Sequence, residues 1–352
     1  MDTGISVAVA IVTYGNRSGL LVQVLQGVFS QTAGDQILRV VVCDNGASQE
    51  TKSLLVGLAD REHKMHIVTL NENMGSAIGY REAIRAAAAF GCKYVWCLDD
   101  DNLPAPDALE KLIRALDMVE PQATLLSLRD DREEYLLRAR AVPVEKAFCR
   151  KYSFLGFSVL DLPRKIWGRA FKNGGNVAAR QLVADVPLEV PYAPFGGLFF
   201  STEILSKVGL PESDFYLYGD DHEFTARFVK LGYPIYLVAG SHIEDLEKSW
   251  HISHPTDSRW RAKRLLLDGE EGNLARLFYS VRNRVFLEVN IWGWRRSHIY
   301  IINAFIYLLL LYVQVLTLRF RGKHLSCVSA TVVLRATAAG WRGRLGKVEA
   351  IV

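Results

Sequence analysis

Three consecutive aspartates, Asp99, Asp100 and Asp101, are the residues whose type and spacing point most directly to chemistry. They follow the short apolar run 94–98, which predicts a buried strand. Carboxylates packed this closely repel one another, so the cluster favours a partner of opposite charge. At the carboxyl end of a strand, Asp99 and Asp101 could converge on one hard divalent cation while Asp100 points elsewhere. The alternative interpretation is a solvated acidic turn that caps the helix after Pro104.

A second acidic group, Asp220 and Asp221 with Glu223, follows the aromatic stretch 215–218 and opens a predicted helix. Aromatic neighbours partly desolvate a carboxylate and raise its pKa, which suits a general base. The sequence therefore predicts an acid–base residue here. The alternative is that acidic residues favour the positive end of the helix dipole, which explains one acid better than three.

The strand predicted at Tyr233–Val238 leads into a polar segment that contains His242 and Asp245, and His251 follows nearby. A strand end that carries a histidine and an acid is a position where a third metal ligand could lie. A lone histidine is more often an ordinary surface residue. The residue types alone do not choose among the three.

Strands and helices alternate along the first hundred residues, and this alternation must position the polar groups. The predicted strands are Val7–Thr13, Leu38–Asp44, His66–Leu70 and 94–98, and the predicted helices are Ser18–Ser30, Glu50–Ala59 and a segment ending at Phe90. Such alternation predicts an α/β fold with a mostly parallel sheet, in which ligands bind beyond the carboxyl ends of the strands. We expect four polar strand ends to share one crevice: Thr13–Tyr14, Asp44–Asn45, Asn71–Asn73 and Asp99–Asp101.

The composition predicts a folded cytoplasmic protein of one large domain and an appendage. The chain has 352 residues, of which 50% are hydrophobic, so a full core can be buried. Its five cysteines show no metal-binding spacing, and several lie in apolar strands, as expected of core residues in a reducing compartment. No basic segment precedes an apolar one at the N-terminus, so we expect no signal peptide.

The C-terminal region from Trp292 onward is basic, with nine lysines and arginines against one acid, in a chain whose net charge is only +4. It contains Ile299–Leu318, 20 residues without a formal charge, between Arg295–Arg296 and Arg319–Arg321. We expect this run to form a helix on the inner face of the cell membrane, attracted by anionic lipid. A bilayer-spanning helix and a helix packed within the protein are the alternatives. Nucleic acid is not an expected partner, because no recognition helix or RNA-binding motif accompanies the charge.

The order and spacing of these motifs resemble the inverting family-2 glycosyltransferases, whose fold is of the GT-A type. The resemblance covers residues 7–290 and is carried by the segments Ala10–Asn16, Val42–Gly46, Asn71–Gly75 with Gly79, Leu98–Asp101, Gly196–Gly197, Asp220–Phe224 and Arg282–Arg284 after Phe278–Tyr279. It implies a catalytic domain at residues 1–290 and a helical, membrane-associating region at residues 291–352. The closest likeness is to galactofuranosyl- and rhamnosyltransferases of bacterial polysaccharide synthesis, and the two acidic motifs point to the galactofuranosyl branch.

The resemblance implies a donor site at the strand ends. Thr13, Tyr14 and Asp44 would hold the nucleotide base, and Asn73 would lie near the ribose or the diphosphate. Mn²⁺ or Mg²⁺ on the diphosphate would be bound by a pair of aspartates from the triple motif. The residues that complete these two predicted sets are Arg17, Asn45, Gly75, Asp99 and Asp100 for the donor, and Asp99 and Asp101 for the metal.

The resemblance also implies Asp221 as the base that takes the proton of the acceptor hydroxyl, with Asp220 and Glu223 orienting the acceptor. The family usually has a metal-binding histidine after the strand that follows these acids, and in this sequence that position falls on Asp245. We therefore expect Asp245 to be the third metal ligand, because a carboxylate serves a hard cation at least as well. His242 and then His251 are the alternatives.

The expected reaction is inverting, metal-dependent transfer of galactofuranose from UDP-galactofuranose to a glycan or a polyprenyl-diphosphate-linked glycan. Transfer of rhamnose from dTDP-rhamnose is the first alternative. A non-catalytic membrane scaffold with a degenerate transferase fold is an alternative of another class. The charge-dense segment Arg129–Lys151 is interpreted as a loop near the acceptor or, equally, as a solvated helix.

Overall fold

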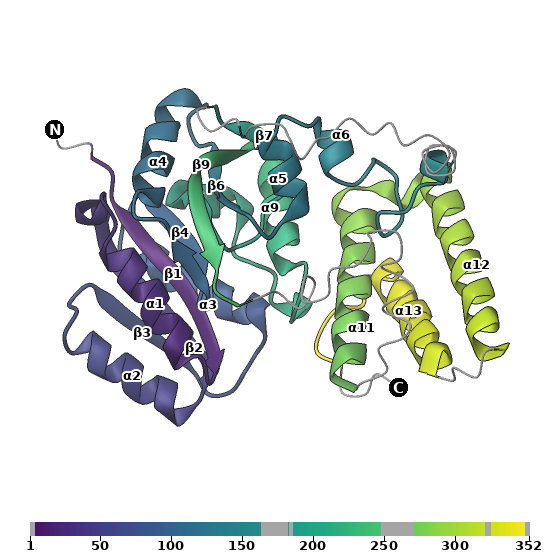
Figure 1. Cartoon of the computed structure of the whole chain (residues 1–352), viewed down its shortest axis with the longest axis horizontal. Coiled ribbons are helices and arrows are strands. Elements are labelled where there is room, and N and C mark those ends of the chain that lie inside the picture. Colours follow the sequence, from purple (N-terminus) through teal and green to yellow (C-terminus); the bar gives the residue numbers. More distant parts are fainter. Residues whose placement is uncertain (1–3, 163–181, 183–185, 248–270, 321–324, 349–352) are drawn as a thin grey trace. The chain divides into compact units, whose positions relative to one another are not determined.

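The computed structural model of the chain describes residues 4–162, 182, 186–247, 271–320 and 325–348 (Figure 1). The chain divides into two compact units. The first is built from Met1–Ala147, Arg180–Ser213 and Asp221–Ser253, and the second from Phe148–Ala179, Asp214–Asp220 and His254–Val352. The two units therefore alternate along the sequence, and the division of the chain near residue 290 stays a prediction.

One sheet organises the first unit, and nine strands form it within the described residues. The strands are β1 (Val7–Gly15), β2 (Ile37–Ala47), β3 (Met65–Leu70), β4 (Tyr94–Asp99), β5 (Asn102–Pro104), β6 (Thr124–Arg129), β7 (Leu188–Val190), β8 (Leu198–Ser201) and β9 (Ile235–Asp245). Their order is β3-β2-β1-β4-β8-β6-β9-β5, with β7 paired to β9. The first four strands are parallel, as the sequence predicts, and β8 is antiparallel to both of its neighbours.

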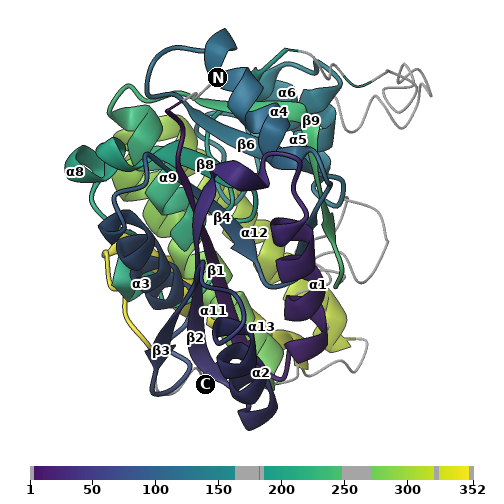
Figure 2. The same ribbon diagram turned by 90° about the vertical axis from the view of Figure 1, so that its left-hand side faces the viewer.

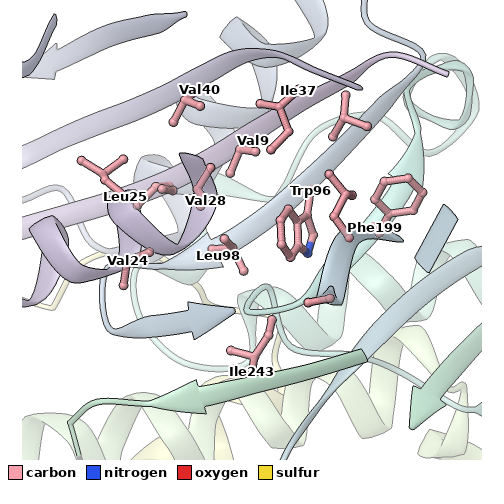
Figure 3. Close-up of a cluster of buried hydrophobic side chains, with 14 of the residues drawn as sticks. Val9, Val24, Leu25, Val28, Ile37, Val40, Trp96, Leu98, Phe199 and Ile243 are labelled. Atoms are coloured by element: carbon pink, nitrogen blue, oxygen red, sulfur yellow. The ribbon is translucent and has the colours of Figure 1, made fainter. Parts of the chain in front are cut away.

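Helices cover both faces of this sheet. Those of the first unit are α1 (Ser18–Phe29), α2 (Gln49–Ala59), α3 (Ser76–Ala89), α4 (Ala108–Ala115), α5 (Glu133–Ala139), α6 (Val144–Ala147), α8 (Leu205–Val208) and α9, which spans Asp220–Lys230 at the unit boundary. In Figure 2, α1 and α3 lie on opposite sides of β1. The main core forms where α1 and α4 meet the strands, and Figure 3 shows Val24, Leu25 and Val28 of α1 beside Val9 and Leu98.

The predicted strands and helices of the first hundred residues are confirmed, but two elements near the aspartates differ from the prediction. Strand β5 follows Asp101 directly, and β9 runs on to Asp245 instead of ending near Val238. The segment predicted as a loop or helix from Arg129 is a strand end followed by α5, and the Arg129 side chain is buried. Each of these differences adds to the site described below.

Three helices form most of the described part of the second unit: α11 (Glu271–Phe286), α12 (His298–Phe320) and α13 (Leu325–Trp341). Helices α11 and α13 approach closely at Gly340, where a Cβ atom would stand 2.3 Å from the carbonyl oxygen of Arg282. A buried carboxylate, Glu288, fixes α12 by accepting hydrogen bonds from Tyr300 Oη (3.1 Å) and Arg284 Nε (2.9 Å). The predicted C-terminal apolar helix is therefore present and partly packed.

Helix α12 has two apolar faces. One packs within its own unit through Tyr300, Leu311 and Val315. The other is exposed, and it includes Phe305 at 67% and Tyr312 at 61% exposure. His298–Thr317 is long and apolar enough to cross a membrane, yet only 22% of its most apolar window is buried. The placement of this helix on, across or away from a membrane stays a prediction.

Candidate active site

The carboxyl ends of the parallel strands bring the predicted polar residues to one edge. Thr13 pairs with Asp44 across β1 and β2, and Val12, which precedes Thr13, pairs with Asp99 across β1 and β4. Parallel strands place equivalent ends together, which is why residues far apart in the sequence become neighbours. The expectation of a shared edge is met by this register.

Asp100 is buried at this edge. Its carboxylate is 3% exposed and accepts hydrogen bonds from Thr13 Oγ1 (2.7 Å) and Arg17 Nε (2.8 Å). Burial raises the pKa of Asp100 to about 6, although Arg17 favours its charged form. Arg17 also donates to Asp101 Oδ2 at 3.0 Å, so one guanidinium ties two of the three aspartates to the segment after β1.

Asp245 reaches the aspartate cluster through the short pairing of β5 with β9. Asn102 lies directly opposite Asp245 in this antiparallel ladder. The buried Asn102 amide donates to Asp245 Oδ1 (2.7 Å) and to Asp101 Oδ1 (3.2 Å), and its oxygen accepts the N–H of Asp99 (3.1 Å). Asn102 therefore links Asp99, Asp101 and Asp245, a role that its residue type did not reveal in the sequence.

Arg129 was not predicted as a site residue, yet it lies between two of the candidate metal ligands. Its side chain is 5% exposed; Nη1 lies 3.2 Å from Asp99 Oδ2, and Nη2 donates to Asp245 Oδ2. Its Nε atom is 3.6 Å from Asp131 Oδ1. Arg129 ends β6, where it pairs with Ile243 of β9, and this pairing points it at the cluster.

A packed aromatic series connects Asp99 to helix α9. Tyr80 of α3 donates its hydroxyl to Asp99 Oδ1 at 2.5 Å, and burial raises the pKa of Tyr80 well above its ordinary value. The Tyr80 ring stacks on Phe195 with centroids 4.0 Å apart. Phe195 in turn lies 5.9 Å from Phe224 of α9. The two acidic groups predicted from the sequence are thus joined by three aromatic side chains.

The charge of the cluster fits a divalent cation. Four aspartates, Asp99, Asp100, Asp101 and Asp245, pair with the guanidinium groups of Arg17 and Arg129, which also contact Glu247 and Asp131. Burial and the neighbouring Asp99 raise the pKa of Asp101 to about 7, and burial and Asp131 raise the pKa of Asp245 to about 6. Surplus negative charge on hard oxygen donors is the environment that Mn²⁺ and Mg²⁺ prefer.

The carboxylates are not already arranged around one point. Among the described residues, no three acidic, histidine or cysteine side chains are grouped as a metal centre would require. His242 lies three residues from Asp245, which puts it on the opposite face of β9, and its Nδ1 is 3.8 Å from Asp130. The other alternative ligand, His251, lies outside the described residues. Asp245 is therefore the candidate that the fold brings to Asp99 and Asp101.

The predicted donor residues line the neighbouring strand ends. The Tyr14 ring is 45% exposed, with the Arg17 guanidinium 5.2 Å from its centroid, whereas Asp44 is buried and accepts the N–H of Ala47 at 2.7 Å. Asn45 accepts the N–H of Met74 (2.8 Å) and donates to Gly75 O (3.0 Å). Asn73 Oδ1 accepts the N–H of Gly75 at 2.9 Å. These amide contacts fix the turn that leads into α3.

Helix α9 carries the second acidic group at its first turn. Asp221 is half-buried, and its Oδ1 accepts the N–H of His222 at 2.7 Å. Glu223 is turned into the protein, where it forms an ion pair with Arg227 at 2.9 Å. Asp220 is 3% exposed. Of the three acids, Asp221 is the most open to a substrate.

The loop before α9 is strained and held within the second unit. Tyr216 and Tyr218 have φ angles of +65° and +63°, which are unfavourable for bulky residues. Asn283 Nδ2 donates to the carbonyl oxygens of Phe215 (3.0 Å), Leu217 (2.8 Å) and Tyr218 (2.7 Å). The recurring motif around Asn283 therefore fixes the backbone that leads into α9.

Comparison with known proteins shows which family and which solved structures this chain resembles. The family described as Glycosyl transferase family 2 matches residues 8–173. The galactofuranosyltransferase GlfT1 of Mycolicibacterium smegmatis is 23% identical over 242 residues, which are 66% of this chain and 68% of that protein. The family match includes the strand ends that carry the triple aspartate.

Two solved structures share the fold. The mannosyltransferase PcManGT of Pyrobaculum calidifontis, in complex with GDP-Man and Mn²⁺, has a TM-score of 0.51 at 16% identity and covers 95% of this chain and 86% of its own. GalNAc-T7 with UDP, GalNAc and Mn²⁺ has a TM-score of 0.51 at 12% identity. The match covers 73% of this chain and 46% of GalNAc-T7, so this chain spans about half of that protein. The predicted GT-A-type α/β fold is confirmed.

Proposed function

We propose that this chain, a glycosyltransferase with a glycosyl transferase family 2 domain, transfers galactofuranose from UDP-galactofuranose by an inverting, metal-dependent reaction. The acceptor in this proposal is a glycan or a polyprenyl-diphosphate-linked glycan of the bacterial cell surface. The choice of sugar is supported by the galactofuranosyltransferase relative, at 23% identity, and by the triple aspartate.

The observation that carries the proposal is the acidic cluster at the carboxyl edge of the sheet. Asp99, Asp101 and Asp245 are linked through Asn102 and hold more negative charge than the two arginines neutralise. These three residues would hold Mn²⁺ or Mg²⁺. When bound, the ion would neutralise the diphosphate charge that grows as the donor bond breaks.

The strand ends beside the cluster would receive the nucleotide. Tyr14 offers an exposed ring on which a base could stack, and Asp44 and Asn73 lie at adjacent strand ends. Thr13 is fully buried, and its hydroxyl is engaged by Asp100, so its contribution would be to shape the pocket. Amide hydrogen bonds of Asn45 and Asn73 already hold the turn into α3, and a turn that is held before binding loses less entropy on binding.

The chemical step would need one base and no protein nucleophile. The acceptor oxygen would form a bond to the anomeric carbon while the bond from that carbon to the diphosphate oxygen breaks. Asp221 would take the hydroxyl proton, because it is the most open acid of α9 and its orientation is fixed by the His222 N–H. A single displacement of this kind inverts the configuration at the anomeric carbon.

We further propose that α12 rests on the inner face of the cell membrane. Its outer face presents Phe305, Leu309 and Tyr312 to solvent, and the exposed Arg295 and Arg296 precede it. Burial of the apolar side chains at the membrane interface would stabilise membrane binding, and attraction of the arginines to anionic headgroups would add a separate contribution. This placement would bring the enzyme to a lipid-linked acceptor.

A panel of nucleotide sugars tests the donor assignment. We expect UDP-galactofuranose to raise the melting temperature in the presence of Mn²⁺ more than dTDP-rhamnose or UDP-glucose does. If dTDP-rhamnose raised the melting temperature more, the donor sugar would be rhamnose, and the protein would still be a glycosyltransferase. Binding of UDP-galactofuranose without any metal-dependent hydrolysis or transfer would instead favour a scaffold that has lost turnover.

A further inference from the structure

Arg129 occupies the space between two of the carboxylates that would hold the metal. Its two terminal nitrogens contact Asp99 Oδ2 (3.2 Å) and Asp245 Oδ2, and the whole side chain is 5% exposed. These two oxygens come from different strands, β4 and β9, so the guanidinium is a cross-link within the site. A guanidinium presents five N–H donors in a rigid fork, which suits such a bridge.

The Gly196–Gly197 turn and Asp131 both lie close to this guanidinium. A Cβ atom on Gly196 would stand 2.6 Å from Arg129 Nη1, 2.8 Å from Asp99 Oδ2 and 2.1 Å from Asn102 Oδ1. The backbone of the Gly196–Gly197 turn therefore closes the site on that side. Asp131 lies on the other side, with Oδ1 at 3.6 Å from Arg129 Nε.

From this geometry we infer that Arg129 is the resident counter-cation of Asp99 and Asp245, and that a divalent cation must compete with it for these carboxylates. The inference rests on the metal site proposed above. A cation bound to both oxygens would face the positive guanidinium at contact distance, and two like charges that close repel strongly in a buried site. Arg129 therefore sets how tightly the metal is held and is a positioning residue, not a metal ligand.

The same arrangement explains why the candidate ligands are not grouped around one point. With Arg129 in place, Asp99 and Asp245 each contact a different terminal nitrogen of its guanidinium, which stands between them. If a donor diphosphate entered, it would offer Arg129 an alternative partner, because guanidinium groups bind phosphate oxygens in the same bidentate way. Metal and donor would then favour one another's binding by drawing Arg129 away from the carboxylates.

Titration with Mn²⁺ alone tests the inference without any turnover. We compare the purified full-length protein with Arg129→Gln, which removes the charge, and Arg129→Lys, which keeps a charge but cannot bridge both carboxylates. The matched control is Arg132→Gln, because Arg132 contacts Asp131 at 3.4 Å and neither Asp99 nor Asp245 in the described structure. Binding is followed by calorimetry and by the melting temperature at increasing Mn²⁺.

We expect Arg129→Gln to bind Mn²⁺ at least about tenfold more tightly than the parent, within the range typical of coupled sites, with Arg129→Lys between them and Arg132→Gln within about threefold of the parent. Mn²⁺ should also raise the melting temperature of Arg129→Gln the most, even if that variant is the least stable without metal. If the parent and Arg129→Gln bound Mn²⁺ equally tightly, Arg129 would not compete with the metal, although the metal site itself would be supported. If Arg129→Gln does not fold, equal binding by the parent and Arg129→Lys overturns it as well. Absence of Mn²⁺ binding to parent and variants alike would overturn the metal site and the competition together.

Discussion

Asp221 is the residue on which the chemical step depends in the proposed reaction. Asp221→Asn keeps the shape and the hydrogen bond from His222 but cannot accept a proton. We expect turnover to fall by about 10²–10⁴-fold, the range typical of a general base, while donor affinity stays within about twofold. Calorimetric donor binding and turnover should be measured on the same preparation. Retention of more than about a tenth of the activity would exclude a general base at this position.

Asp101 should make the stability of the metal-free protein depend on pH. Burial and Asp99 raise the pKa of Asp101 to about 7, above the value of about 4 for an exposed aspartate. The folded state therefore holds a proton that the unfolded state has lost between about pH 4 and pH 7, so stability falls as the pH rises through this window.

Asp101→Asn should remove this contribution. We subtract the melting temperature of the parent from that of the variant at each pH. This difference is expected to be a few degrees more positive at pH 8 than at pH 5. The measurement is a series of melting curves in the presence of a chelator. A difference between the two proteins that is the same at pH 5 and pH 8 would show that Asp101 ionises normally.

The sequence identified the acids of the site but not their partners. Asp99–Asp101 form a run of one residue type at a strand end, and such a run is visible without a structure. Arg129 and Tyr80 are one arginine and one tyrosine among many, and they reach Asp99 only because β6 and α3 place them there. Contacts between residues about twenty to thirty positions apart depend on how strands and helices are placed in the fold. The type of a single residue does not show this placement.

At the scale of elements, the turn at Gly196 is expected to be intolerant of any added side chain. A Cβ atom at this position would overlap Asn102, Arg129 and Asp99 at 2.1–2.8 Å, so Gly196→Ala must displace the acidic cluster. We expect at least about a tenfold loss of Mn²⁺ and donor affinity, with a lower melting temperature from the overpacking.

Gly57→Ala on α2 is the control, because a Cβ atom added at Gly57 would have no other atom within 4 Å among its surroundings. This substitution should be neutral or raise stability by up to about 1 kcal/mol through helix propensity. Donor titrations and melting curves on both variants test whether the Gly196 turn supports the site. Normal donor affinity in Gly196→Ala would mean that this turn does not support the site.

The elements that were not predicted from the sequence lack a local pattern of apolar and polar residues. Strand β9 was predicted only to Val238, because Gly240–His242 interrupts the apolar run. It continues because it pairs with β6 beyond a register shift at Ser127/Leu128 and then with β5. These pairings are made with strands far away in the sequence, and they are what carry Asp245 to Asp101.

At the scale of the whole molecule, the exposed face of α12 should attach the protein to membranes. Replacing Phe305 and Tyr312, which are 67% and 61% exposed, by aspartate puts charge on that face without disturbing the packed one. We expect the double variant to lose about tenfold or more in binding to anionic vesicles, because each buried aromatic contributes about 1.5–3 kcal/mol. Vesicle flotation across a salt series measures this.

The control is Val56→Asp, which changes an apolar side chain of similar exposure (58%) on α2. Release of the parent by high salt alone would mean that the apolar face does not enter the membrane. Resistance to both salt and carbonate would mean that α12 spans the bilayer. A parent protein that never floats with anionic vesicles would contradict membrane attachment.

Sequence composition described this region only in part. The 20-residue uncharged run was visible, but one face of it packs within the second unit and another is exposed, and a uniformly apolar sequence cannot show which face is which. Helix α11 belongs to the second unit, which gathers segments from three parts of the chain. Long-range assembly of this kind follows from packing and leaves no boundary signal in the sequence.

The most direct measurement of the central claim is the mass of an acceptor glycan incubated with the protein, UDP-galactofuranose and Mn²⁺. We predict a product heavier by one hexosyl residue, whose formation is abolished by a chelator and restored by added Mn²⁺. Formation of the same product at the same rate with the chelator present would contradict the metal dependence. An unchanged acceptor, with a folded protein, Mn²⁺ and every nucleotide sugar of the panel, would contradict the transferase itself.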